Sequence, residues 1–345
     1  MIRVATCVPE QRKDRAPKLE WLEGAIDRTK PDLFLTPQEY LGGHWVMPHD
    51  QHIEAAWFER ELSALAKRKK VALGVGATVQ QASGGATQDY AFFGPDGTHR
   101  GTHRKFAHPG YDDVRAGGAG RLWPETSYAA RTRPVEMPEL GLKVGTVFCW
   151  EVFSLSLFPA YSFAGANLIA HPIKFAPRGW PKLDKAGGKR SIKSFGNPGG
   201  KGLDLWRDKL VMASRHEALC PIAVSCNTWD LGKGYFALGG HVDELTGSSD
   251  LHEVECLPGA ELLHTFDMNP AYYTGLDAHF SPAQFKAAVG SLDGFHKLDP
   301  WTMHTKVRRL EAQLIGDTTR LDCQLKAATM ARQKASIFKR MRRPQ

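Results

Sequence analysis

The sequence predicts a single α/β domain followed by a C-terminal helical extension. Short apolar runs alternate along most of the chain with segments whose apolar residues recur at helical spacing. Several runs, such as residues 142–149, are apolar without polar alternation, which is typical of strands buried on both faces. We find no internal repeat and no linker that would mark a second domain. Helices packed on the faces of a sheet are therefore expected.

Each expected element in the first 150 residues has a local signal. Residues 18–29 carry Leu19, Leu22 and Ile26 at helical spacing, and Pro95-Asp96-Gly97 is a turn signal between two strands. The expected strands of this part are 2–8, 32–36, 71–79, 89–93, 98–105 and 142–149. The expected helices are 18–29 and 52–69.

The alternation continues to about residue 270. The expected helices are 153–165 and 203–219, and the expected strands are 166–173, 221–226, 235–243, 252–256 and 261–268. We assign residues 1–270 to the α/β domain and residues 271–345 to the extension. The extension carries apolar residues at alternating three- and four-residue spacing, namely Met303, Val307, Leu310, Leu314, Leu321 and Leu325. This amphipathic helix is expected to pack on its own domain or on another subunit.

Composition indicates a globular protein that works in a reducing compartment. Of the 345 residues, 42% are hydrophobic and 24% charged, which is enough for a sizeable core. No run reaches the roughly 20 apolar residues that span a bilayer, and the first residues lack a secretory signal. The six cysteines are scattered without a C-x-x-C pair, as expected of reduced thiols. We therefore expect a cytoplasmic protein.

The net charge of +8 is concentrated in two places. Residues 174–203 are rich in glycine, proline and lysine, and residues 332–343 carry six basic residues and no acid. Such runs attract acidic substrates, nucleic acid or membrane surfaces, but they are also common as solvated loops and tails. The tail lacks the interleaved aromatic residues that would stack on bases.

Three chemically useful residues each end an apolar run. Glu39 follows Pro37-Gln38, Lys105 ends the strand at 98–105, and Cys149 ends the strand at 142–149. A thiol at a turn into a helix is favoured as the thiolate, and a nearby carboxylate can take its proton. An ammonium group in a closed site can stabilise an oxyanion. Each residue alone is unremarkable, and the order and spacing of the three carry the prediction.

Together these segments resemble the nitrilase superfamily of carbon–nitrogen hydrolases, over roughly residues 2–270. Thr36-Pro37-Gln38-Glu39 is similar to the segment with the superfamily's glutamate, and Arg104-Lys105 to the one with its lysine. The nucleophile segment is represented by residues 145–151, with Phe158-Pro159 and residues 165–169 downstream. Further similarity lies in Trp206, Ala213, Arg215, Glu217 and Cys226-Asn227.

The resemblance implies an αββα sandwich that often dimerises, with no metal and no organic cofactor. It implies that Cys149 attacks an amide, carbamoyl or nitrile carbon, that Lys105 stabilises the developing charge, and that Glu39 shuttles protons. The backbone N–H of Trp150 is a candidate second oxyanion donor. Ammonia or an amine leaves, and water releases the acid from a thioester.

Further site residues are expected by the same resemblance. Glu125 is similar to the second glutamate of carbamoylase-like members, and Asp113 matches the position used by aliphatic amidases. Glu151 is expected either to orient the nucleophile or to be an acidic residue that the helix dipole favours at a helix N-terminus. Substrate contacts are expected from Tyr40, His44, Trp45, Trp150 and Lys174. We further expect the basic segment 174–203 to border the pocket and to admit a substrate bearing a carboxylate.

These observations predict a cysteine hydrolase of amide or N-carbamoyl bonds that forms a homodimer or larger homo-oligomer. One alternative is a nitrilase, because Cys149-Trp150-Glu151 resembles the nitrilase branch of the superfamily. The next residue, Val152, does not match that branch. A transferase that passes the acyl group to an amine is another. An inactive scaffold that binds nucleic acid through its basic loop and tail is an alternative of a different class. We expect small molecules rather than nucleic acid or membranes as partners.

Overall fold

A computed structural model of the chain supports the expected α/β architecture. The structure describes residues 1–10, 15–42, 52–80, 86–105, 133–153, 157–174, 181–183, 189–191, 201–227 and 236–273.

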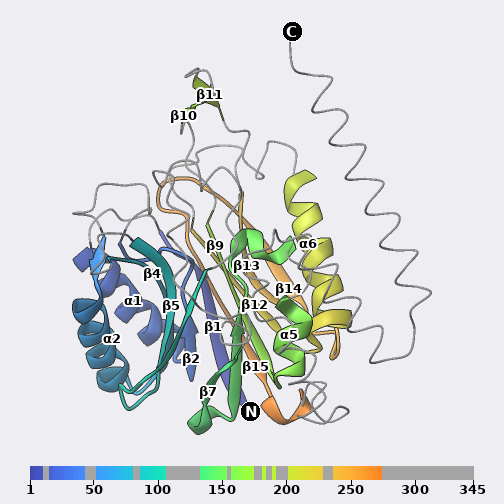
Figure 1. Cartoon of the computed structure of the whole chain (residues 1–345), viewed down its shortest axis with the longest axis horizontal. Coiled ribbons are helices and arrows are strands. Elements are labelled where there is room, and N and C mark those ends of the chain that lie inside the picture. The colour runs from blue at the N-terminus through green and yellow to red at the C-terminus, as the bar shows by residue number, and fades with distance from the viewer. Residues whose placement is uncertain are drawn as a thin grey trace, which may run out of the picture.

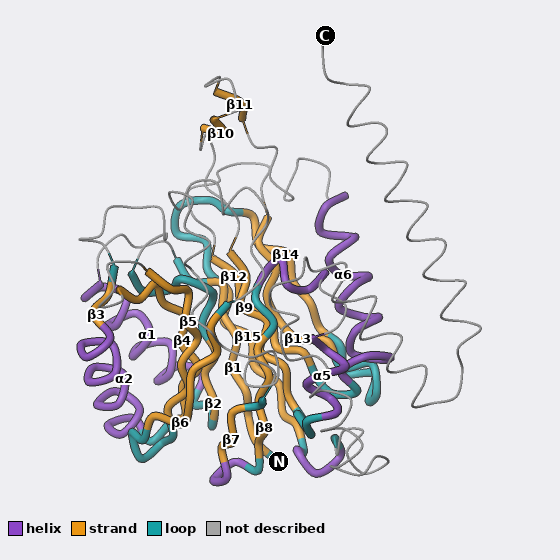
Figure 2. The backbone as a smooth tube through the Cα atoms, viewed as in Figure 1, coloured by secondary structure: helices purple, strands orange, loops and turns teal. Residues whose placement is uncertain are grey.

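The strands form two mixed sheets that lie face to face (Figure 2). The first sheet has the order β15 (Leu262–Met268), β1 (Ile2–Val8), β2 (Leu33–Leu35), β4 (Ala72–Gln80), β5 (Ala86–Phe93) and β6 (His99–Arg104), and β3 (Ile53–Glu54) pairs with β4. The second sheet has the order β14 (Asp250–Glu255), β13 (Phe236–Val242), β12 (Ile222–Asn227), β9 (Leu168–Lys174), β8 (Leu142–Thr146) and β7 (Val135–Met137). Strand β1 faces β12 and β13, which places the middles of the two sheets against each other.

Helices cover the outer face of each sheet, which completes an αββα sandwich (Figure 1). The first sheet is covered by α1 (Arg15–Thr29) and α2 (Ala55–Lys69), drawn in blue at the left of the view. The second sheet is covered by α5 (Leu157–Phe163) and α6 (Lys201–Ala213) at the right, and Ser214–Ala218 extends α6 as a π-helix. None of the described helices is long and apolar enough to cross a bilayer.

Strand β1 shows why the central strands are apolar on both faces. Its Val4 and Val8 belong to the core between the sheets, whereas Ala5 and Cys7 belong to the core under α1 and α2. Because successive side chains of a strand point to opposite faces, a strand between two apolar layers is apolar at most positions. The buried Thr6 is an exception, and its hydroxyl donates to the Gly240 carbonyl.

Most expected elements are present, with differences at short strands. Residues 53–54, expected as helix, form β3, so that α2 begins at Ala55. Strand β7 was not expected, and the segment predicted as a basic loop contains the hairpin of β10 (Pro181–Leu183) and β11 (Lys189–Ser191). The amphipathic helix and nearly all of the extension lie outside the described residues.

Candidate active site

The three candidate catalytic residues all follow strands that end at one edge of the sandwich. Strand β2 is parallel to β4, and β6 runs in the same direction because β5 is antiparallel to both β4 and β6. In the second sheet β8, β9 and β12 are parallel. We call the edge where β2, β6, β8, β9 and β12 end the carboxyl edge.

Two contacts between the sheets show that both contribute to the same carboxyl edge. At the end of β12, the Asn227 amide Nδ2 donates to the backbone oxygen of Gln38, at 2.6 Å. At the end of β9, the Lys174 ammonium contacts the Glu39 carboxylate. The turn that bears Glu39 is therefore held by residues of the opposite sheet.

Glu39 is buried and its backbone is left-handed. Its side chain is inaccessible to solvent, and its φ of +53° lies in a region that non-glycine residues rarely adopt. The preceding turn is anchored by Thr36, whose hydroxyl accepts from the N–H of Gly76 at 3.1 Å and whose carbonyl accepts from the Tyr90 hydroxyl at 2.9 Å. A conformation of this kind persists only where the surrounding structure enforces it.

The Glu39 carboxylate has a partner on each oxygen. The Gln88 amide donates to Oε1 and the Lys174 ammonium donates to Oε2. The Gln88 side chain is itself oriented by Gln38, whose Nε2 donates to Gln88 Oε1 at 2.9 Å. The orientation of the carboxylate is therefore fixed by two hydrogen bonds.

Lys105 lies next to this network in the first sheet. Its backbone N–H donates to the Gln88 carbonyl at 2.9 Å, which makes Lys105 and Gln88 neighbours across β5 and β6. The Lys105 residue is 4% exposed, so that its side chain is buried at the carboxyl edge. The ammonium group of Lys105 is therefore enclosed in the same part of the molecule as Glu39.

Cys149 begins a 3-10 helix, Cys149–Phe153, and also has a left-handed backbone, with a φ of +33°. Its Sγ donates to the Lys174 carbonyl at 3.4 Å. The turn is closed by Glu151, whose backbone N–H donates to the Phe148 carbonyl and whose carboxylate accepts from the Phe148 N–H at 3.0 Å. Glu151 is fully buried, and its two expected roles, orienting the nucleophile or serving as an acid at a helix N-terminus, stay predictions.

Lys174 joins the two halves of the site. Its carbonyl accepts from the Cys149 thiol, while its ammonium contacts the Glu39 carboxylate. Burial lowers the pKa of Lys174 well below the ordinary value, and the charge of Lys18 lowers it further. The substrate-binding role expected for Lys174 stays a prediction.

His171 supports the nucleophile turn from β9, and the sequence did not indicate it. Its Nδ1 hydrogen-bonds the Val147 carbonyl at 2.5 Å, and its Nε2 accepts from Trp206 Nε1 at 2.8 Å. Burial lowers its pKa to about 4, so that the ring is neutral at pH 7. The neutral ring therefore connects the end of β8 to α6. Sequence spacing could not reveal this contact, because it depends on which strands are neighbours.

The expected substrate-binding residues have different outcomes. Tyr40 is buried in the core under α1, where its hydroxyl donates to the Lys18 carbonyl and its ring contacts Trp21. This packing against α1 and Trp21 does not support substrate contact by Tyr40. The backbone of Trp150 lies in the 3-10 helix of Cys149. The remaining expected residues, His44, Trp45, Asp113 and Glu125, lie outside the described residues.

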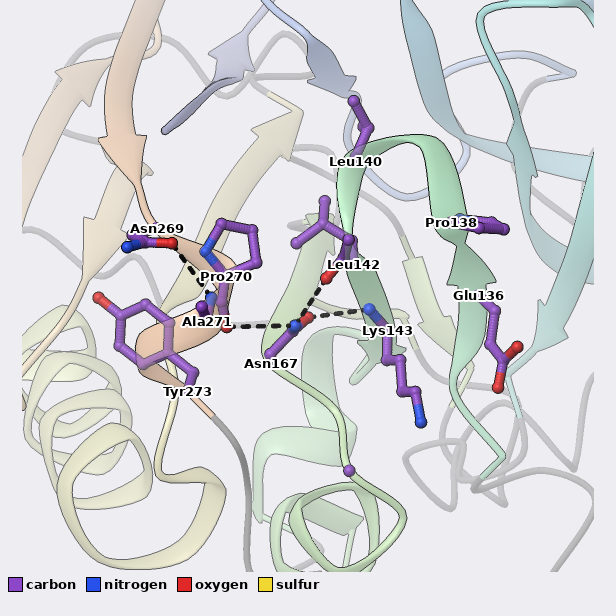
Figure 3. A pocket seen from close by; sticks show the side chains of 12 residues that line it. Glu136, Pro138, Leu140, Leu142, Lys143, Asn167, Asn269, Pro270, Ala271 and Tyr273 are labelled. Atoms are coloured by element: carbon purple, nitrogen blue, oxygen red, sulfur yellow. Dashed lines mark hydrogen bonds between the residues drawn. The ribbon is translucent and has the colours of Figure 1, made fainter.

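An open pocket of about 780 Å³ lies at the other end of β8 (Figure 3). It is lined by Leu142 and Lys143, where β8 begins, and by Asn269, Pro270, Ala271 and Tyr273 after β15. Asn167 closes its base, since its side chain accepts from the Lys143 N–H at 2.8 Å and donates to the Gly141 carbonyl at 2.9 Å. This pocket is separate from the carboxyl edge and contains none of the candidate catalytic residues.

Comparison with known proteins identifies the fold. No family model matches the sequence, and no curated protein matches it. Solved structures do match. One is an amidase from Nesterenkonia sp. AN1, a glutamate-to-glutamine mutant with acrylamide added at its active-site cysteine. It has a TM-score of 0.52 and 14% identity, over 83% of this chain and 99% of that chain.

Two further structures give the same result. A carbon–nitrogen hydrolase from Helicobacter pylori G27 has a TM-score of 0.54 and 15% identity, over 76% of this chain and 88% of that chain. The NitFhit protein of C. elegans has a TM-score of 0.54 and 16% identity, over 82% of this chain and 64% of that chain. The chain therefore shares its αββα fold with an amidase of the nitrilase superfamily and with a carbon–nitrogen hydrolase, and the expected resemblance is confirmed at the level of the fold.

Proposed function

We propose that the protein is a cysteine-dependent hydrolase of non-peptide carbon–nitrogen bonds, acting on an amide or an N-carbamoyl amide. The observation that carries the proposal is the position of Lys174, which contacts the Cys149 thiol with its carbonyl and the Glu39 carboxylate with its ammonium group. The Cys149 thiol after β8, the Glu39 carboxylate after β2 and Lys174 at the end of β9 thus meet at one edge, and Lys105 is buried after β6 at the same edge. This is the set of groups that nucleophilic catalysis by a thiol requires.

The first half of the reaction forms a thioester. Glu39 accepts the thiol proton, and the Cys149 sulfur attacks the carbonyl carbon, whose oxygen becomes an oxyanion. The Lys105 ammonium stabilises that charge, with the backbone N–H of Trp150 as a second donor. Glu39 then returns the proton to the leaving nitrogen, and the carbon–nitrogen bond breaks to release ammonia or an amine.

The second half hydrolyses the thioester. Glu39 takes a proton from water, and the resulting hydroxide attacks the thioester carbon. The carbon–sulfur bond breaks, the carboxylic acid leaves, and the proton returns to Cys149. Glu125, or in its place Asp113, is the proposed second carboxylate of this cycle. Lys174 keeps the Glu39 carboxylate oriented through both halves, so that it is a positioning residue.

The positive charge of segment 174–203 supports the proposal that the substrate carries a carboxylate. Its hairpin of β10 and β11 stands beyond the carboxyl ends of the parallel strands in Figure 1. Arg178 belongs to this segment and is the residue to test, because Lys174 is engaged with Glu39. We expect Arg178→Glu to raise KM for acidic substrates and to leave KM for neutral amides unchanged. Equal effects on both substrate types would remove this part of the proposal.

The activity is tested by measuring ammonia and amine release from a panel of amides, N-carbamoyl amines and nitriles. We expect turnover of an amide or N-carbamoyl substrate by the wild type and none by Cys149→Ala. Turnover of nitriles with the amides left intact would identify the nitrilase alternative. Acyl transfer to an added amine without acid formation would identify a transferase. Activity retained by Cys149→Ala would exclude the proposed nucleophile.

A further inference from the structure

Three metal-ligating side chains meet where the outer strands of the two sheets come together. Asp250 and His252 lie on β14, the outermost strand of the second sheet, and His264 lies on β15, the outermost strand of the first. Their side-chain ligand atoms all lie within 4.8 Å of one another. Neither the fold nor the proposed hydrolysis accounts for this cluster.

The strand geometry directs the three side chains to one point. Asp250 and His252 are two residues apart on a strand, so that both project from the same face. The Asp250 carboxylate Oδ2 is 3.1 Å from His252 Nε2 and 3.8 Å from His264 Nδ1. In a tetrahedral zinc site with bonds of about 2.0–2.2 Å, neighbouring ligand atoms are roughly 3.3–3.6 Å apart. The distance of 3.1 Å lies just below this range and the distance of 3.8 Å just above it.

His264 is oriented by a second histidine behind it. Its Nε2 is 2.9 Å from Nδ1 of His241, and the His241 ring stacks on Phe266 with centroids 4.1 Å apart. A ligating histidine usually bonds a fixed group through its other ring nitrogen, which sets the orientation of the ring. His264 is buried, whereas the side chains of Asp250 and His252 are 54% and 41% exposed. One ligand is therefore fixed, and the outer two can adjust to an ion from solvent.

We propose that Asp250, His252 and His264 bind a divalent transition-metal ion of the zinc type. Two imidazole nitrogens and one carboxylate oxygen suit Zn²⁺, and water completes a tetrahedral site at the exposed side. The ion joins the outermost strands of the two sheets. Strands β13 and β12 separate β14 from β9, so the site is distinct from the one around Lys174. An ion that binds only the folded state also stabilises that state.

The test is zinc binding to the full chain in a Cys149→Ala background, which removes as a competing ligand the one thiol that is not fully buried among the described cysteines. Isothermal titration with ZnCl₂ after chelator treatment is expected to show one ion per chain and a rise in Tm. Asp250→Asn and His252→Ala each alter an exposed side chain and are expected to weaken binding by about 10-fold or more. The matched control is His216→Ala, which removes an exposed histidine elsewhere and is expected to leave the affinity unchanged.

Each outcome bears directly on the proposed metal site. The site is supported if Asp250→Asn and His252→Ala lose Zn²⁺ binding and His216→Ala retains it, whatever the result of the hydrolase assays. Absence of stoichiometric binding, or equal affinity of all variants for Zn²⁺, would overturn it and leave the cluster as hydrogen-bonded surface residues.

Discussion

Glu39 and Cys149 share a left-handed backbone conformation, at φ of +53° and +33°. Such conformations cost on the order of 1–3 kcal/mol each in non-glycine residues. In both cases groups distant in sequence hold the residue in place, through Asn227 at the Gln38 carbonyl and through Lys174 at the Cys149 thiol. The two residues with the main chemical roles in the proposal therefore both have a strained backbone, and both lie at the carboxyl edge.

The role of Glu39 as general base predicts a large loss of activity on Glu39→Gln. The amide keeps the size of the side chain but cannot accept a proton from the thiol, and kcat/KM is expected to fall by about 10²–10⁴-fold. The control Glu20→Gln alters an exposed glutamate of α1 and should leave kcat/KM unchanged. Steady-state kinetics on the best substrate of the panel provide the measurement. Near-normal activity of a folded Glu39→Gln variant would contradict the assignment.

The contact between Lys174 and Glu39 predicts a change in the pH dependence of the reaction. In Lys174→Met the Glu39 carboxylate stays buried without its ammonium partner, which favours the neutral acid. The acidic limb of the pH profile of kcat/KM is therefore expected to move to higher pH. Lys143→Met, which removes an exposed lysine at the other end of β8, is the matched control. An unchanged acidic limb in Lys174→Met would show that Lys174 does not set the state of Glu39.

The sequence was most informative at residues that carry chemistry at strand ends. Glu39, Lys105 and Cys149 could be selected because each lies at the end of an expected strand. Gln88 and His171 could not, because both lie within strands and their roles depend on contacts between strands. Lys174 could be named as a site residue, but its contact with Glu39 requires two sheets whose carboxyl ends coincide.

Among the elements, β4 supports the Glu39 turn through a glycine. A Cβ at Gly76 would lie 2.3 Å from the Pro37 carbonyl oxygen and 2.9 Å from the Cα of Gln38. Both contacts are with backbone, so a side chain at this position must displace the turn.

Gly76→Ala is therefore expected to destabilise the protein by about 1–3 kcal/mol and to lower kcat. Gly24→Ala is the matched control, because a Cβ at Gly24 in α1 meets nothing within 4 Å, and it should stabilise by about 0.5–1 kcal/mol. Denaturant unfolding measures both changes. A Gly76→Ala variant as stable and active as the wild type would show that the turn is not packed in this way.

His171 predicts a loss of stability at acidic pH. Its pKa is about 4 in the folded chain and near 6.5 unfolded, so the unfolded state takes up the proton first as pH falls. This contribution is absent above pH 6.5 and grows to on the order of 3 kcal/mol of destabilisation by pH 4. His171→Gln should reduce the slope of unfolding free energy against pH, whereas exposed His216→Gln should not. Identical slopes for His171→Gln and the wild type would refute this contribution.

The elements that the sequence missed are short. Strands β3 and β7 have two and three residues, and so do not show enough alternation to be recognised. Residues 53–54 continue directly into an amphipathic helix, which explains why they were expected to be helical. Long apolar strands such as β4 were predicted within one residue, because burial on both faces leaves a continuous signal.

At the scale of the whole molecule, local patterns predicted the alternation of strands and helices but not the order of strands in the sheets. Only the resemblance to the nitrilase superfamily predicted two sheets face to face, and the solved structures bear out that fold. The reason is physical. Strand order depends on contacts between residues far apart in sequence, such as β1 with β15, and no short segment records them.

The expected homo-oligomer is testable by light scattering on the purified chain. We expect a native mass of at least two chains of 38.2 kDa, since the nitrilase-type sandwich often dimerises. A mass of one chain at micromolar concentration would contradict this expectation. A variant lacking residues 296–345 locates the contact. An unchanged number of chains per particle would place the contact on the sandwich, and a smaller number would place it on the amphipathic extension.

The central claim is that Cys149 is an activated nucleophile, and brief exposure to iodoacetamide followed by intact-protein mass spectrometry tests it most directly. Of the described cysteines, four are buried and Cys149 is half-buried. Burial also raises the pKa of Cys7 and Cys220, and that of Cys256 to about 12, so that their thiolates are scarce. We expect fast addition of a single label that is lost in Cys149→Ala. Slow labelling spread over several cysteines, or labelling unaffected by Cys149→Ala, would contradict the account.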